Sequence, residues 1–290
     1  MSEELFEFLS LKKNNESKVI YNHNTNTNSD ANILIYVSGN WYDEFKVEEI
    51  IRLAVQYPNA KIIISGGSGR LTLPEVKEMG GEPMYLFKCL VERAKQEYEN
   101  LSSIKERCVL CNSSIVTTHN VKFLMYYLSQ CADIEGWNTI ASTATSRLSK
   151  KKYKIFVIDE SFLLRRLKAT LLQQIEISTN VKKDFPIDML HSIEFVCSNS
   201  QSSADMTNNH LGGKAVAAYL QIGEFKRLIN YSNGKEQNLF TRKQAGLISD
   251  EVNNLMKVVE QLEDTFIEEL DAFLSCSSLN ELQTAIMPRF

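Results

Sequence analysis

The sequence has no long block of basic residues and no long apolar run. Its 290 residues carry a net charge of −4, and the densest basic segment, residues 149–154, directly precedes an apolar run that predicts a strand. A general nucleic-acid binder needs a basic surface, so nucleic acid is not an expected partner. A membrane-spanning helix needs about 20 apolar residues in succession, which the chain does not contain, so no membrane partner is expected either.

Cysteine and histidine are scarce, and neither forms a metal-ligand pattern. The six cysteines are scattered, and the single C-x-x-C, Cys108 to Cys111, has no second pair that would complete a zinc site. The four histidines also lack ligand spacing. No basic-then-apolar leader is visible near Met1. We therefore expect reduced thiols, no metal and a cytoplasmic protein.

Strands and helices alternate along residues 31–197. Continuous apolar runs, typical of buried parallel strands, predict strands at 31–37, 61–64, 108–110, 153–158 and 193–196. Helical spacing of apolar residues predicts helices at 46–57, 84–99, 119–130 and 162–176. The sequence thus predicts an α/β fold with a Rossmann-like, doubly wound, mainly parallel sheet and helices on both faces.

The remaining segments are predicted to flank this domain. Residues 1–30 are interpreted as a helical segment over 3–20 and a polar linker, residues 31–210 as the α/β domain, and residues 211–290 as a C-terminal helical extension packed on it. Apolar residues recur at three- and four-residue steps across 249–275, which predicts one long amphipathic helix. Packing on the sheet domain is the favoured role for this helix, and binding a protein partner is the alternative.

Four loops are predicted to meet where the parallel strands end. They begin at Ser38, Ser65, Cys111 and Asp159, and ligands of open α/β sheets bind at this edge. The Ser-Gly-Gly-Ser-Gly turn at 65–69 is expected to offer bare backbone amides to an anion. It matches neither the Walker loop nor the dinucleotide fingerprint, and the chain has no Gly-x-Ser-x-Gly elbow. Thr117 or Thr118 is expected to cap the following helix.

Five segments in this order resemble the SanA/YdcF-like family (domain of unknown function 218), closest to its cytoplasmic YdcF branch. They are the strand and Gly-Asn end at 33–40, the Ile-Ser-Gly-Gly loop at 63–69, the Ser/Thr/Asn positions of 114–120, the strand and Arg-Arg helix at 157–170, and the Gly-Glu-x-x-Arg-Leu segment at 223–228. Cys111 and His119 stand where the family has acidic residues, so the chain looks like a divergent member.

The resemblance implies a small-molecule ligand of adenosyl or nucleotide type, such as S-adenosylmethionine, at the carboxyl ends of the strands. The residues expected to bind it are Gly39, Asn40, Ser65, Gly66, Gly67, Gly69, Ser114, Thr117, Asn120, Asp159, Arg166, Glu224 and Arg227. Two alternatives stay open. One is a protein-interaction factor that has lost the chemistry and docks through the 249–275 helix. The other is an enzyme acting on a phosphorylated or activated metabolite, with His119 or Asp159 as acid or base.

Overall fold

The computed structural model describes residues 17–21, 31–38, 44–68, 72, 74–97, 104–114, 117–140, 152–160, 163–182 and 187–197. Several predictions lie outside these residues. They are the binding roles of Gly39, Asn40, Gly69, Glu224 and Arg227, the C-terminal extension over 211–290, and the amphipathic helix over 249–275.

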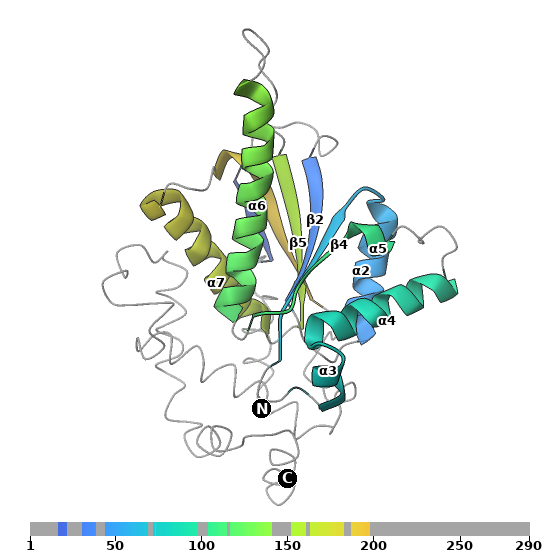
Figure 1. Ribbon diagram of the computed structural model, residues 1–290. Coiled ribbons are helices and arrows are strands. Elements are labelled where there is room, and N and C mark those ends of the chain that lie inside the picture. The colour runs from blue at the N-terminus through green and yellow to red at the C-terminus, as the bar shows by residue number, and fades with distance from the viewer. Residues whose placement is uncertain are drawn as a thin grey trace, which may run out of the picture.

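The described residues form a six-stranded sheet with the order β1-β6-β5-β2-β3-β4 (Figure 1). Its strands are β1 (Lys18–Ile20), β2 (Ala31–Ser38), β3 (Lys61–Ser65), β4 (Cys108–Cys111), β5 (Lys152–Asp159) and β6 (Leu190–Cys197). All neighbouring strands are parallel except β1, which pairs antiparallel with β6. The predicted α/β fold with a mainly parallel sheet is therefore confirmed.

Helices cover both faces of the sheet (Figure 1). One face packs against α2 (Glu44–Gln56), α4 (Glu82–Glu97) and α5 (Ile104–Arg107), and the other against α6 (Thr117–Ile140) and α7 (Leu164–Glu176). Short helices complete the described part: α3 (Pro74–Glu78), the π-helix η4 (Ile177–Lys182) and the 3-10 helix η5 (Ile187–Met189). The prediction of helices on both faces is thus confirmed.

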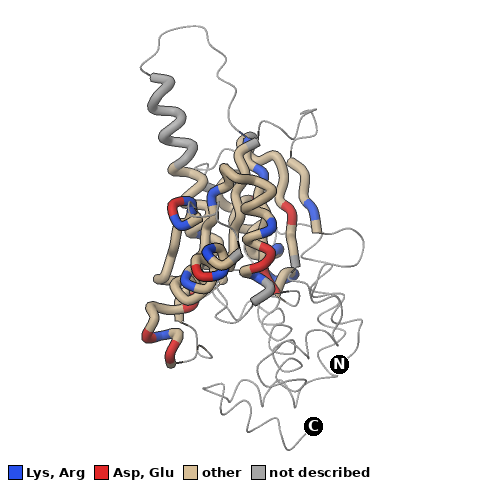
Figure 2. Tube along the Cα trace, turned by 90° about the vertical axis from the view of Figure 1, so that its right-hand side faces the viewer, with Lys and Arg blue, Asp and Glu red and all other residues tan. Residues whose placement is uncertain are grey.

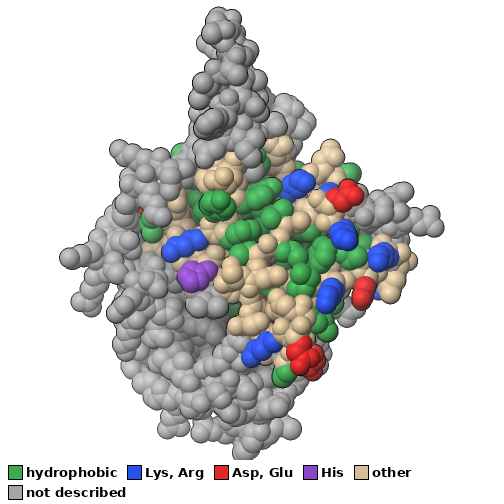
Figure 3. Space-filling model, viewed as in Figure 1, with side chains coloured by type: hydrophobic (Ala, Val, Ile, Leu, Met, Phe, Trp, Pro, Cys, Tyr) green, Lys and Arg blue, Asp and Glu red, His purple; other side chains and the backbone are tan. Residues whose placement is uncertain are grey.

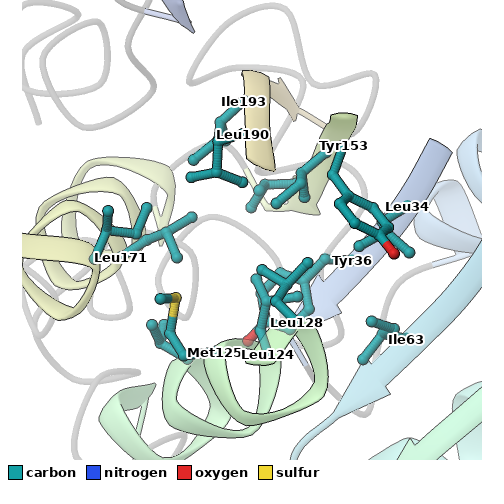
Figure 4. Packing of buried hydrophobic residues seen from close by; sticks show 14 of the residues in the cluster. Leu34, Tyr36, Ile63, Leu124, Met125, Leu128, Tyr153, Leu171, Leu190 and Ile193 are labelled. Atoms are coloured by element: carbon teal, nitrogen blue, oxygen red, sulfur yellow. The ribbon is translucent and has the colours of Figure 1, made fainter. Parts of the chain in front are cut away.

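Each of the five parallel strands contributes to two apolar cores because successive side chains point to opposite faces. In β2, Leu34 and Tyr36 join the core under α6 and α7, whereas Ile35 and Val37 join the core under α2 and α4. Figure 4 shows the first core, where Leu124 and Leu128 of α6 lie against the strand residues. Two buried faces explain why these strands have continuous apolar sequences rather than alternating ones.

Three predictions about secondary structure are wrong in detail. Residues 18–20, predicted as the end of a helix, form strand β1, because pairing with β6 favours the extended Lys-Val-Ile segment. Helix α6 continues to Ile140, beyond the predicted end at residue 130. The apolar spacing that predicts the helix at 46–57 also places Val55 on its buried side, but Val55 is 47 % exposed and Leu53 is buried.

The surface of the described part carries both apolar and charged side chains. Strand β4 is an edge of the sheet, and all four of its residues are only half-buried. Figure 3 shows apolar side chains gathered on the face that contains this edge, with basic residues around them. Figure 2 shows acidic and basic residues interspersed along the described chain. Among the described helices, none combines the length and apolar character required to cross a membrane.

Candidate functional site

The carboxyl ends of the five parallel strands lie at one edge of the sheet, at its lower end in Figure 1. The chain runs from β2 outward to β3 and β4, and then continues on the other side of β2 with β5 and β6. The direction of winding therefore reverses between β2 and β5. In open α/β sheets, a ligand crevice forms outside the strand ends at such a reversal. Ser38 ends β2 and Asp159 ends β5, so these residues flank the reversal.

A buried ion pair occupies this position. The Lys46 ammonium, from the first turn of α2, lies 2.5 Å from Oδ1 of Asp159, and the two side chains are 0 % and 3 % exposed. Lys46 Nζ also donates a hydrogen bond of 3.1 Å to the carbonyl oxygen of Ser38. The backbone N–H of Glu160 donates a further bond of 2.9 Å to Asp159 Oδ1. One ammonium thus joins α2 to the ends of both central strands.

Hydrogen bonds extend this contact across the sheet edge. Asn120, in the first turn of α6, donates from Nδ2 to Ser38 Oγ over 3.1 Å. Ser65 Oγ, at the end of β3, donates to Asn120 Oδ1 over 3.3 Å. Together with the ion pair, these contacts form a continuous chain, which we call the edge network: Asp159, Lys46, Ser38, Asn120 and Ser65. All five residues are buried, so the network fixes the strand ends relative to α2 and α6.

The Tyr36 hydroxyl lies beneath this network without a hydrogen bond of good geometry to the described residues. Burial raises the pKa of Tyr36 well above its ordinary value, and the charge of Asp159 raises it further. Ser65 partly offsets the rise, although the hydroxyl of Ser65 itself is directed to Asn120. At neutral pH the phenol is therefore a neutral donor close to the ends of β3 and β5.

Arg166 joins the first turns of α6 and α7. Its Nη1 donates to Thr117 Oγ1, and Arg166 is 9 % exposed. Neither α6 nor α7 has an acidic residue in its first turn, and Leu163, which precedes α7, provides no side-chain cap. Anions are favoured at helix N-termini, and cations there are unfavourable unless an anion compensates them. The Arg166 guanidinium and the two helix N-termini are thus groups that favour an anion at this corner of the edge.

The predicted capping of α6 is not what these threonine hydroxyls do. Thr117 accepts a hydrogen bond from Arg166. Thr118 is 1 % exposed, and its hydroxyl has no partner among the described residues. The prediction that Thr118 caps the helix is wrong, because its side chain is buried within the fold rather than directed to the first amides of α6.

The glycine turn after β3 packs against the loop before α6 rather than presenting bare amides to a ligand. The N–H of Gly66 donates to the carbonyl of Cys111 over 2.9 Å, and the carbonyl of Gly66 accepts from Ser114 N over 3.0 Å. A Cβ atom on Gly67 would lie 1.9 Å from the Ser114 carbonyl oxygen. The Gly66 amide is thus not available to an anion, contrary to the expectation for this turn. Gly67 instead allows the loop that carries Ser114 to approach closely.

The candidate acid–base residues differ in their surroundings. His119 is exposed on the first turn of α6. Asp159 is 2 % exposed, and burial raises its pKa above the ordinary value while the Lys46 ammonium opposes that rise. The ammonium group that contacts the Asp159 carboxylate is therefore that of Lys46, from the same chain. No cluster of three or more potential metal ligands occurs among the described residues.

The C-x-x-C segment forms strand β4 with free thiols at Cys108 and Cys111, as expected from its strand-like sequence. Burial raises the pKa of Cys108 to about 11. Because the thiolate is the nucleophile, we expect iodoacetamide at pH 8 to alkylate Cys108 on the order of 100-fold more slowly than an unstructured cysteine. Peptide mass spectrometry over time measures this rate. Alkylation of Cys108 at the rate of a free peptide thiol in the folded protein would contradict the assignment.

The structure brings Ser65, Gly66, Gly67, Ser114, Thr117, Asn120, Asp159 and Arg166 to the same sheet edge, as the sequence predicted. Sequence reasoning missed Lys46 and Tyr36. A lysine four residues before Ile50, on the stripe of α2 that faces the sheet, was the available signal for Lys46.

Neither a protein-family model, nor a curated protein, nor a solved structure matches the chain.

Proposed function

We propose that this chain is a YdcF-like protein that binds an adenosyl or nucleotide-type ligand, such as S-adenosylmethionine, outside the carboxyl ends of β2 and β5. The observation that carries the proposal is the reversal of winding between these two strands. Counted along the chain, the parallel strands have the spatial order 3-2-1-4-5, the arrangement of a Rossmann-like doubly wound sheet. Such sheets bind mononucleotides and dinucleotides at this reversal.

The charges at the edge support a ligand that has an anionic group at one end and a hydroxyl or amine at the other. Arg166, Thr117 and the two helix N-termini favour an anionic group, which is a phosphate in a nucleotide or the carboxylate in S-adenosylmethionine. Asp159 lies at the end of β5, where a hydroxyl or amine of the ligand is the suitable partner. Gly39, Asn40, Glu224 and Arg227 complete the proposed site through the family resemblance alone. The scattered cysteines favour a cytoplasmic location.

The proposal predicts stabilisation by the ligand. At a ligand concentration of about 100 Kd, binding raises the free energy of unfolding by about 2.7 kcal/mol, which corresponds to roughly 5–10 °C in Tm for a domain of this size. We expect such a shift in a thermal-shift assay with S-adenosylmethionine, S-adenosylhomocysteine, ATP, GTP or NAD. The absence of a shift with all five compounds at millimolar concentration would contradict the proposal.

A pair of arginine variants tests where the anionic group binds. We expect R166Q to weaken binding of the stabilising ligand by about 10-fold or more, because a charge-assisted contact is lost. R52Q is the matched control, since Arg52 is exposed on the outer side of α2 and pairs with Glu49. Calorimetric titration of both variants measures the affinities. Equal affinities would show that the anionic group does not bind at Arg166.

A further inference from the structure

The carboxylate of Asp159 is held through only one of its two oxygens. The Lys46 ammonium at 2.5 Å and the Glu160 backbone N–H at 2.9 Å both donate to Oδ1. No described residue donates a hydrogen bond to Oδ2. A carboxylate oxygen accepts about two hydrogen bonds, so Oδ2 retains its full capacity to accept from a ligand within the described part of the site.

Lys46 is well placed to hold this carboxylate in one orientation. Its ammonium is fully buried and also donates to the Ser38 carbonyl, so it is held from the β2 side and the β5 side together. The helix that carries it is anchored by Val47, Ile50 and Ile51, which are buried against the sheet. A binding group needs this kind of support from a second residue, because small errors in orientation weaken a hydrogen bond.

We propose that Oδ2 of Asp159 accepts a hydrogen bond from a donor of the ligand, either a ribose hydroxyl or an ammonium, and that Lys46 is the positioning residue that orients the carboxylate for it. The inference rests on the proposed function and assigns the two ends of the ligand. The donor end lies at Asp159, and the anionic end lies at Arg166, because a phosphate beside a carboxylate would be repelled.

The surroundings of Asp159 make the role of Lys46 dependent on pH. Among the described residues, the charged or titratable groups that interact with Asp159 are Lys46 from α2, Glu160 next along the chain and Tyr36 from β2. Lys46 is the largest influence that favours the ionised form. A neutral residue at position 46 therefore shifts Asp159 toward its protonated form, in which the carboxyl group loses acceptor capacity. Raising the pH restores the carboxylate.

The test compares analogues by calorimetric titration of the full chain. The first pair of probes is adenosine and 2′,3′-dideoxyadenosine, which differ in the ribose hydroxyls. The second is S-adenosylhomocysteine and 5′-methylthioadenosine, two thioethers that differ in the amino-acid portion that carries the ammonium, with R166Q correcting for the carboxylate. We expect the wild type to bind the complete member of one pair about 10-fold or more tightly, since hydrogen bonds to charged groups are strong.

Three variants test whether Lys46 orients the Asp159 carboxylate or only stabilises the fold. In K46M at pH 7 the preference should fall below about 3-fold and should recover as the pH is raised, a recovery that a misfolded site would not show. D159N, which keeps the shape of the side chain, should lose the preference at every pH. K88M is the control, because Lys88 is exposed on α4, and it should keep the wild-type preference.

The outcomes distinguish this inference from the proposed function. If the wild type binds both members of each pair equally well, or if K46M keeps the full preference at pH 7, the inference is overturned while the proposed function stands. If no adenosyl or nucleotide probe binds the wild type, the proposed function fails and this inference fails with it.

Discussion

Replacing Lys46 with methionine is expected to lower the free energy of unfolding by about 3–5 kcal/mol at neutral pH. Methionine has a similar length and fills the space, so the loss comes from electrostatics rather than from a cavity. The variant leaves the buried Asp159 carboxyl group without its cation, so this group must either stay charged in the interior or bind a proton at neutral pH, and removal of one partner of a buried pair costs this much. Urea denaturation at pH 7 measures the change, with K88M expected to lie within about 0.5 kcal/mol of the wild type.

A double variant separates the interaction between Lys46 and Asp159 from the effect of changing each residue alone. K46M/D159L removes both charges and leaves apolar side chains, so it should recover most of the stability that K46M loses. The double-mutant cycle then gives a large coupling free energy. A loss below about 1 kcal/mol in K46M would show that the pair is solvated, because exposed ion pairs contribute no more than that.

The loss in K46M should shrink in acid. Burial raises the pKa of Asp159 above its ordinary value of 3.8, so the folded state binds a proton at higher pH than the unfolded state. The contribution of this group to stability therefore falls as the pH rises from the unfolded pKa through the folded pKa. Without Lys46 the folded pKa rises further, and near the unfolded pKa both states bind the proton, so the cost of the missing ammonium disappears. A K46M loss independent of pH would contradict this explanation.

Replacing Gly67 with alanine is expected to lower the free energy of unfolding by about 3 kcal/mol or more. The added Cβ would lie 1.9 Å from the Ser114 carbonyl oxygen, and this neighbour is backbone rather than a flexible side chain. Relief of the clash requires the turn after β3 to separate from the loop before α6. That movement would break the hydrogen bonds that Gly66 makes with Cys111 and Ser114.

Gly80 supplies the matched control. Its φ is 99°, which favours glycine, but a Cβ there would meet Met84 at an ordinary contact distance of 3.6 Å. G80A should therefore cost only the strain of a left-handed conformation, about 1–2 kcal/mol. Denaturant titration of both variants ranks them, and a G67A variant no less stable than G80A would refute the close approach at Gly67.

The sequence predicted the α/β fold because the evidence for it is local. A strand buried on both faces needs a continuous apolar run, and residues 61–64 and 153–158 show one directly in the chain. The antiparallel strand β1 was missed for the opposite reason. Its three residues form a strand only through pairing with β6, which is far away in the sequence. The strand order has no local signature either.

The sequence predicted that several of the candidate residues lie at the carboxyl ends of the strands, but it predicted none of their contacts and missed Lys46 and Tyr36. Asn120 and Ser65 were both expected at the strand ends, yet only the folded chain directs one side chain to the other. Lys46 resembled an ordinary surface lysine near a helix start, and its partner Asp159 follows 113 residues later. Gly67 was expected in a ligand-binding turn, and only the folded chain shows how closely the Ser114 backbone approaches it.

A crystal structure of the full chain with S-adenosylmethionine or an adenine nucleotide tests the central claim most directly. The claim predicts electron density for the ligand outside the carboxyl ends of β2 and β5, with its anionic group near Arg166 and a donor within hydrogen-bond distance of Asp159 Oδ2. Ligand bound at another part of the surface, or a complex in which this edge stays empty at saturating ligand, would contradict it.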